Sequence, residues 1–205
     1  MALDRNVIAA MAKWPDVPDV YNWLMLDARG RYRVRARDYE VSRRFDTIGN
    51  TAVVEFIARN TAHDDTGRWY FQNGPQRVFL SFAVTPLVAR LQPQGMPLLH
   101  TGAPVLRVDA VWIDEHAAAI LETDAGPALI DDRDNPLFLN SLKPMAGAVL
   151  DDASIEEWLQ EPASGVMQWD ICNQSVPVNA IARAQLPLRF GFCAAPQPPA
   201  GAADC

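Results

Sequence analysis

The chain has 205 residues, 49% of them hydrophobic and 21% charged, which is ordinary for a folded protein and excludes general disorder. At this length a hydrophobic core can form without a disulfide or a metal. The net charge of -7 argues against general affinity for nucleic acid, and the lack of any run of about 18 apolar residues excludes a transmembrane helix.

The first predicted element is an amphipathic helix over 4–14. Leu3, Val7 and Met11 recur at helical spacing, and Pro15 closes the segment. These apolar positions would form the buried stripe of the helix.

The next segment, "RGRYRVRAR", carries arginine at alternate positions. In a regular strand Arg31, Arg33 and Arg35 share one face, while Tyr32 and Val34 point the other way. Guanidinium groups in a row suit phosphate or carboxylate groups, so one interpretation is a surface for an anionic ligand or an acidic partner. The alternative is a solvated strand face with no binding role.

A second helix is predicted over 51–61, with Asn50 or Thr51 as its cap. Its inner face carries three apolar side chains at helical spacing, namely Val53, Phe56 and Ile57.

The stretch "AHDDTGRWYFQNGPQRVFL" predicts a hairpin. Alternation places Trp69 and Phe71 on one face, tucked inside for packing. A four-residue loop over 73–76 pairs Phe71 with Val78 and keeps Pro75 out of the ladder, where it would lack a donor.

His63, Asp64 and Asp65 at the start of this stretch raise the question of catalysis. Adjacent residues of an extended chain point to opposite faces, so an acid–base pair or a metal site would need a distorted backbone and outside partners. The core shared by "LDARGR" and "HDDTGR" instead predicts two turns, in which Asp accepts backbone N–H groups and Gly takes a positive φ.

The remainder reads as a long loop over 92–104 followed by short strands separated by turn residues. The predicted strands cover 105–114, 118–123, 127–131, 166–172 and 176–182. A capping box from Ser154 to Glu157 leads into a third, short helix that Pro162 stops. No helix lies between the strands to make a parallel crossover, which favours antiparallel pairing.

The predicted fold class is therefore α+β, mainly antiparallel sheet built from β-hairpins, with about three short helices packed on it. We expect a single domain over 1–193. The Pro/Ala-rich segment 194–205 has almost nothing to bury and is expected to be a flexible tail.

The segment "IDDRDNP" clusters three carboxylates, which can hold magnesium or calcium through oxygen atoms. The glycine and the terminal glutamate of an EF-hand loop are absent, and a turn leading to Pro136 explains the same residues. His100 lies in a predicted loop without metal-ligand spacing. The candidate pocket residues are His63, Asp64, His100, Asp131, Asp132 and Asp134; no metal site and no cofactor are predicted.

Cys172, Cys193 and Cys205 show neither the even count nor the spacing of a disulfide framework or a zinc site. They are interpreted as reduced thiols, and the expected location is the cytoplasm.

Five motifs together carry a resemblance to a known family: "AAMAKWPDVP", "NWLMLDARG", "GRWYFQNGPQR", "ETDAGPALIDD" and "LPLRFGF". The chain resembles an uncharacterised proteobacterial family classed as a domain of unknown function, over about 3–192. Its most specific marker is the segment 67–77. The resemblance implies a bacterial cytosolic protein and assigns no activity, cofactor or catalytic residue.

Three functional hypotheses follow. The first is a nonenzymatic accessory or interaction protein, as a homodimer or with another protein, through an arginine and aromatic surface at Arg31, Arg33, Arg35 and Arg77; tryptophan and arginine are enriched at interfaces, and catalytic signatures are missing. The second is a small-molecule-binding protein or an enzyme with a pocket between sheet and helices. The third is nucleic-acid binding through the arginine stripe, which the net charge disfavours.

Overall fold

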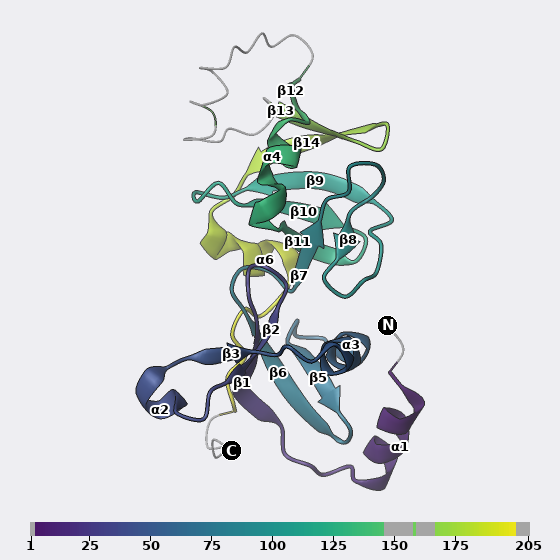
Figure 1. Ribbon diagram of the computed structural model, residues 1–205, viewed down its shortest axis with the longest axis vertical. Helices are drawn as coiled ribbons and strands as arrows, with labels where there is room; N and C mark the ends of the chain where they lie inside the picture. The colour runs from purple at the N-terminus through teal and green to yellow at the C-terminus, as the bar shows by residue number, and fades with distance from the viewer. Residues whose placement is uncertain (1–2, 146–157, 159–166, 200–205) are drawn as a thin grey trace. The chain divides into compact units, whose positions relative to one another are not determined.

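The computed structural model describes residues 3–145, 158 and 167–199. The chain divides into two compact units, most of whose helices and strands are labelled in Figure 1. Unit 1 comprises Met1–Asp27, Arg31–Val84 and Gly191–Cys205, and unit 2 comprises Ala28–Gly30 and Thr85–Phe190. The expectation of one domain over 1–193 stays a prediction.

Unit 1 is built on a six-stranded sheet in the order β3-β2-β1-β6-β5-β4. Its strands are β1 (Val20–Leu26), β2 (Tyr32–Arg35), β3 (Phe45–Thr47), β4 (Thr61–His63), β5 (Trp69–Asn73) and β6 (Gln76–Phe82). Its helices are α1 (Arg5–Lys13), α2 (Tyr39–Ser42) and α3 (Thr51–Arg59). Figure 1 shows α3 beside β5, which it contacts.

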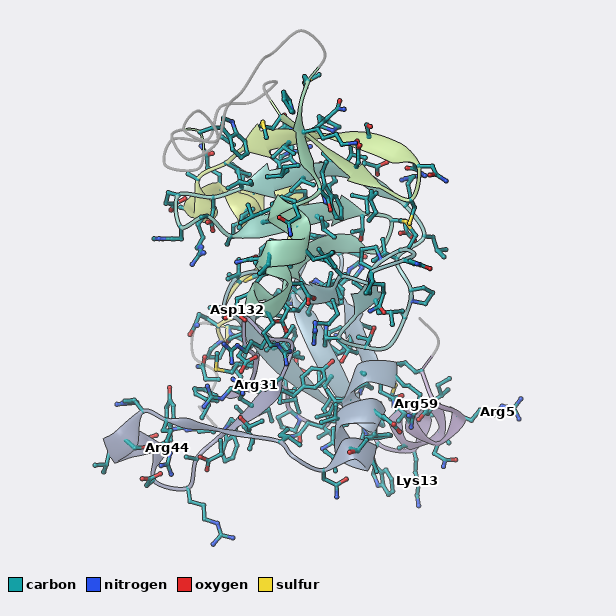
Figure 2. The ribbon with its side chains drawn as sticks, turned by 45° about the horizontal axis from the view of Figure 1, so that its top comes forward. Arg5, Lys13, Arg31, Arg44, Arg59 and Asp132 are labelled. Carbon is teal, nitrogen blue, oxygen red and sulfur yellow. The ribbon has the colours of Figure 1, made fainter. Side chains whose placement is uncertain are left out.

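The two helices predicted in this part of the chain are confirmed as α1 and α3. Asn50 caps α3, because its side-chain oxygen accepts a hydrogen bond from the Val53 N–H at 3.2 Å. The basic residues at the two ends of α1, Arg5 and Lys13, project outward from the helix (Figure 2).

The β5–β6 hairpin has the predicted register, with Phe71 opposite Val78, but the predicted four-residue loop is wrong. Asn73 pairs with Gln76, so the loop has only two residues, Gly74 and Pro75. Gly74 takes a φ of +57°, which permits this tight turn, and Pro75 then lies outside the ladder.

Unit 2 is built on an eight-stranded sheet in the order β12-β13-β14-β9-β10-β11-β7-β8. Its strands are β7 (Leu87–Arg90), β8 (Leu98–Leu99), β9 (Val108–Ile113), β10 (Ala119–Thr123), β11 (Gly126–Ile130), β12 (Leu142–Pro144), β13 (Met167–Ile171) and β14 (Gln174–Ala180). Its helical segments are η1 (Asp132–Asp134), α4 (Asn135–Leu139), η2 (Arg183–Gln185) and α6 (Leu186–Phe190).

The α+β composition is as predicted, whereas the pairing is more mixed than expected. Among the described residues nine strand pairings are antiparallel and three are parallel. The parallel pairs β1–β6, β11–β7 and β14–β9 join strands that are distant in the chain, so their crossovers contain other strands and not a single helix. The sequence prediction looked only for a helix between consecutive strands, so it did not find these parallel pairs.

The helices also exceed the predicted three. The described residues contain five α-helices and two short 3₁₀ segments. The third predicted helix, from Ser154, lies outside the described residues except for Trp158. Among the described residues no helix is long and apolar enough to cross a membrane.

The side chains of the β5–β6 hairpin serve packing as predicted, though unequally. Phe71 is buried and meets Phe56 of α3 edge to face, with ring centroids 5.5 Å apart. Trp69 is half-buried, with its ring 5.2 Å from the His63 ring. The start of the predicted tail joins unit 1, because Ala194 O accepts a hydrogen bond from the Phe82 N–H at 2.9 Å; flexibility beyond it stays a prediction.

Candidate functional site

A cavity of about 540 Å³ opens in unit 1 and is lined by α3 together with strands β1, β2, β5 and β6. Of its twelve lining side chains ten are apolar or aromatic, and the other two, Asn73 and Gln76, are neutral amides. The cavity therefore offers a large apolar wall with hydrogen-bonding groups from one hairpin. We call it the unit 1 cavity.

Strand pairing explains how distant segments contribute to one wall. Leu24 of β1 lies opposite Val34 of β2, and Phe71 of β5 lies opposite Val78 of β6. Because side chains alternate between the faces of a sheet, these apolar residues line the face that α3 also contacts.

Strand β1 is irregular where it lines the cavity. The register of β1 against β6 shifts between Val20 and Leu24, and Asn22 takes a left-handed φ of 61°. A bulge of this kind bends a strand and redirects its side chains. Trp23 of β1 and Val53 of α3 line the cavity and are 40% and 42% exposed.

No lining residue of the unit 1 cavity is ionisable. The Gln76 amide donates to Pro18 O at 3.1 Å and so ties the hairpin to the chain before β1. The Arg35 guanidinium lies 5.4 Å from the centroid of the Trp23 ring, but it pairs with Glu40. The cavity thus suits an uncharged body, since an ion would lose its hydration without gaining a partner.

The predicted arginine surface is largely engaged in contacts within unit 1. Arg31 Nε donates to Asp27 at 2.8 Å, Arg33 donates to the Phe45 carbonyl, and Arg35 also covers the Tyr39 ring. Arg77 differs, because its guanidinium lies over the Tyr70 ring at 4.7 Å and makes no ion pair among the described residues.

The predicted turn role of Asp64 is confirmed. Its carboxylate accepts the N–H groups of Thr66 and Arg68 at 3.0 and 3.1 Å, and also the Arg68 Nε. Burial opposes ionisation, but hydrogen bonds from Thr66 and Arg68 lower the pKa of Asp64 to about 2. His63 Nδ1 lies 3.2 Å from Asp64 O, and its exposed ring does not line the unit 1 cavity.

The turn at Asp27 uses the same chemistry. Its carboxylate accepts the Arg31 N–H at 3.0 Å and the Arg31 Nε at 2.8 Å, and Gly30 takes a φ of +71°. The shared Asp-x-x-Gly-Arg core is therefore turn chemistry, as predicted.

The three candidate aspartates of unit 2 form arginine-paired contacts where β11 ends. Asp131 caps η1 and accepts hydrogen bonds from Arg133, which lower the pKa of Asp131 to about 2. Asp134 binds Arg90 Nε at 2.7 Å, and Asp132 binds Arg29 at 2.9 Å. The predicted turn is a short helical segment leading into α4, and each carboxylate has a cationic partner.

His100, the remaining candidate, lies in unit 2 beside β7. Its Nδ1 accepts the Val88 N–H at 3.3 Å, and burial lowers the pKa of His100 to about 4. The ring is therefore neutral near pH 7 and acts as a structural acceptor.

Sequence reasoning missed most of the unit 1 cavity. Val53, Phe56 and Ile57 were identified as one helix face, but their partners on β1 and β2 come from distant positions in the chain, through pairings that local patterns do not specify. The sequence did indicate that partners were needed, because the predicted hairpin and the predicted helix each had an apolar face that must pack against other residues.

The structure is thus an α+β protein with an apolar cavity that no ionisable residue lines. A family model, DUF2944, described as "Protein of unknown function (DUF2946)", matches residues 3–197, so the chain belongs to this family. This confirms the predicted membership of an uncharacterised family. The function of the family is unknown.

No curated protein matches the chain. A crystal structure of a DUF1285 family protein from Silicibacter pomeroyi DSS-3 is similar, with a TM-score of 0.51 and 13% sequence identity. The match covers 88% of this chain and 97% of that chain. At this identity the likeness shows the fold alone.

Proposed function

We propose that the protein is a ligand-binding protein whose unit 1 cavity holds an uncharged, largely apolar small molecule. One observation carries the proposal: ten of the twelve side chains lining a cavity of about 540 Å³ are apolar or aromatic. Ligand pockets typically have volumes of about 300–1,000 Å³, mostly apolar walls and a few polar groups that fix orientation. Asn73 and Gln76 supply those groups.

The apolar wall favours a ligand with a large apolar surface. Each buried CH₂ contributes about 0.8 kcal/mol, so affinity should rise along a homologous series until the cavity is full. The amides of Asn73 and Gln76 can each donate and accept, so a hydroxyl or carbonyl end would be bound without a charge.

The test uses N-phenyl-1-naphthylamine, a neutral fluorophore, and its displacement by a series of 1-alkanols. We expect saturable fluorescence enhancement and stronger displacement with each added CH₂. Val53→Trp narrows the cavity at a position that is 42% exposed, and it should weaken probe binding about tenfold or more, since bulk replaces ligand contacts.

The matched control is Val41→Trp on α2, where the side chain is 91% exposed and does not line the unit 1 cavity. This variant should bind the probe like the unaltered protein. Equal affinity in the two tryptophan variants, or no binding at all, contradicts the proposal.

A second candidate is a protein contact in the cytoplasm, with another protein or a second copy of the chain. Arg77 favours it, because this guanidinium stacks on Tyr70 without a carboxylate partner among the described residues. Arginine and tyrosine are enriched at interfaces. Light scattering of the unaltered chain and of Arg77→Ala tests for a second copy, and a pull-down with the same two chains tests for another protein. If both chains are monomers and both retain the same proteins, the result counts against this candidate.

A further inference from the structure

The two polar side chains of the unit 1 cavity lie together at one end of it. Asn73 and Gln76 are opposite each other in the last pair of the β5–β6 hairpin, next to the turn. The other lining residues of these two strands, Phe71 and Val78, lie further from the turn. The hairpin end of the cavity is therefore polar, and the rest of its wall is apolar.

The strand register gives the length of the cavity. Val34, which lines it, lies opposite Leu24 of β1, and Leu24 lies opposite Leu80 of β6. Leu80 is four positions beyond Gln76 along β6. At about 3.3 Å per residue and 4.8 Å per strand, the Cα atoms of Gln76 and Val34 are about 16 Å apart. A volume of about 540 Å³ spread over this length corresponds to a mean width of roughly 6 Å, so the cavity is long and narrow.

Helix α3 follows the same direction as the cavity. It begins soon after Ile48, a lining residue whose N–H donates to Tyr32 O of β2 at 2.9 Å. Beyond its other end, Asn60 O accepts the Gln72 N–H of β5 at 2.8 Å. The helix therefore runs from the β2 side of the sheet to the β5 side, and its nine residues span about 13 Å at 1.5 Å each. This length agrees with the length that the strand register gives.

The two amides at the polar end are not equally available. Gln76 Nε2 already donates to Pro18 O at 3.1 Å. Asn73 is exposed, and its side-chain amide has no hydrogen-bond partner among the described residues. Because an amide presents both N–H donors and an acceptor oxygen, it is best matched by a head group that also donates and accepts. A hydroxyl group does both, whereas an ether oxygen only accepts.

We propose that the unit 1 cavity binds a straight-chain amphiphile of about ten to twelve carbons whose neutral head group both donates and accepts hydrogen bonds, as in a primary alcohol. The head group lies at Asn73, and the chain extends along α3 so that its end lies near Ile48. An extended chain advances about 1.3 Å per carbon, because its bonds of about 1.52 Å zigzag, so about twelve carbons span the cavity. This inference rests on the proposed function and adds the length, the head group and the orientation of the bound molecule.

The first experiment tests the length of the chain and the position of its end. Primary alcohols from 1-hexanol to 1-tetradecanol displace N-phenyl-1-naphthylamine from the protein. Affinity should rise about fourfold with each CH₂ and stop rising at about ten to twelve carbons. Ile48→Trp should lower this limit, because the larger side chain occupies the place of the chain end. A limit that is the same in Ile48→Trp, or a series without a limit, would overturn the proposed orientation and length.

The second experiment tests the head group. It compares 1-decanol with methyl nonyl ether, an isomer that has no hydrogen-bond donor. The alcohol should bind about fivefold more tightly, the value of one hydrogen bond. Asn73→Ala should abolish this preference and still bind N-phenyl-1-naphthylamine, since the apolar wall is unchanged. The control is Asn140→Ala, at an exposed position of unit 2 that does not line the cavity, and it should keep the full preference.

The results distinguish this inference from the proposed function. Equal affinity for the alcohol and the ether in the unaltered protein, or the same preference in Asn73→Ala, would overturn the assignment of the head group. Both results can occur while N-phenyl-1-naphthylamine binds, and the proposed function then stands without the inference. If the unaltered protein does not bind the fluorophore or any of the alcohols, both proposals are wrong.

Discussion

Two turns, Asp64–Arg68 in unit 1 and Asp114–Ala118 in unit 2, have the same hydrogen bonds but different sequences. In each, the N–H of the fourth residue donates to the carbonyl of the first at 3.0 Å. The aspartate side chain in each also accepts the N–H groups of the third and fifth residues, at 2.9 to 3.1 Å. The first aspartate therefore determines the turn in both units.

The two turns differ at the fourth residue and in the arginine that they bind. Gly67 takes a φ of +74° in the first turn, whereas Ala117 takes +56° in the second. Asp64 binds Arg68 within its own turn, and Asp114 binds Arg183 Nε at 2.6 Å from a distant segment. The difference shows that the turn alone tolerates alanine, so glycine at position 67 answers a packing requirement.

Because of this packing requirement, we expect the largest loss of stability from a substitution of Gly67. A Cβ at Gly67 would lie 2.1 Å from Gly191 O, a backbone atom of the same unit that cannot rotate away. Gly67→Ala should destabilise unit 1 by about 2–5 kcal/mol, from left-handed strain and overpacking together. Urea unfolding followed by tryptophan fluorescence measures the loss.

Gly102→Ala is the matched control for this substitution. Gly102 also takes a positive φ, +83°, but a Cβ there would meet nothing within 4 Å. It should cost only the strain of about 1–2 kcal/mol. An equal loss in both variants would show that the contact with Gly191 is unimportant.

Removing the aspartate of each turn should have unequal effects as well. The Asp114 side chain is fully buried against Arg183, so Asp114→Ala leaves a partly buried guanidinium and two N–H groups unpaired, at a cost of about 3 kcal/mol. The Asp64 side chain is 18% exposed, so water can replace part of its contacts, and Asp64→Ala should cost about 1–2 kcal/mol. Denaturant unfolding of the two variants compares them; a larger loss at Asp64 would reverse the ranking.

The turns and their contacts show which parts of the structure could be predicted from the sequence and which could not. The turns at Asp27 and Asp64 were predicted because every bond that forms them lies within five residues. The same holds for α1, α3 and the Phe71–Val78 register. Gly191 against Gly67, Arg183 on Asp114 and the wall of the unit 1 cavity depend on pairings across 69 or more positions or on parallel strands, and no local pattern encodes these.

An acid titration tests how much the ionised Asp64 carboxylate stabilises the turn in unit 1. The folded pKa of Asp64 is about 2, below its ordinary value of 3.8, so the folded state binds this proton less readily than the unfolded chain. The stability that Asp64 contributes is complete above pH 3.8 and is lost as the pH falls through 2. A ¹³C titration of the carboxyl measures the midpoint. Thr66→Val removes one hydroxyl donor and should raise it; an unchanged midpoint would deny Thr66 that role.

The smallest effect is expected at Ala117, and it has the opposite sign. Ala117 holds a left-handed φ that costs a residue with a Cβ about 1–2 kcal/mol, whereas glycine adopts it freely. Glycine also makes the unfolded chain more flexible, which offsets about 0.4–1 kcal/mol of that gain. Ala117→Gly should therefore stabilise unit 2 by up to about 1 kcal/mol, measured by urea unfolding.

Ala118→Gly is the control for this prediction. It lies at a neighbouring position without a positive φ, so it carries only the entropic cost and should destabilise unit 2. Because the hydrogen bonds of the turn are unchanged in both variants, a loss of stability in Ala117→Gly would mean that its Cβ makes contacts worth more than the backbone strain.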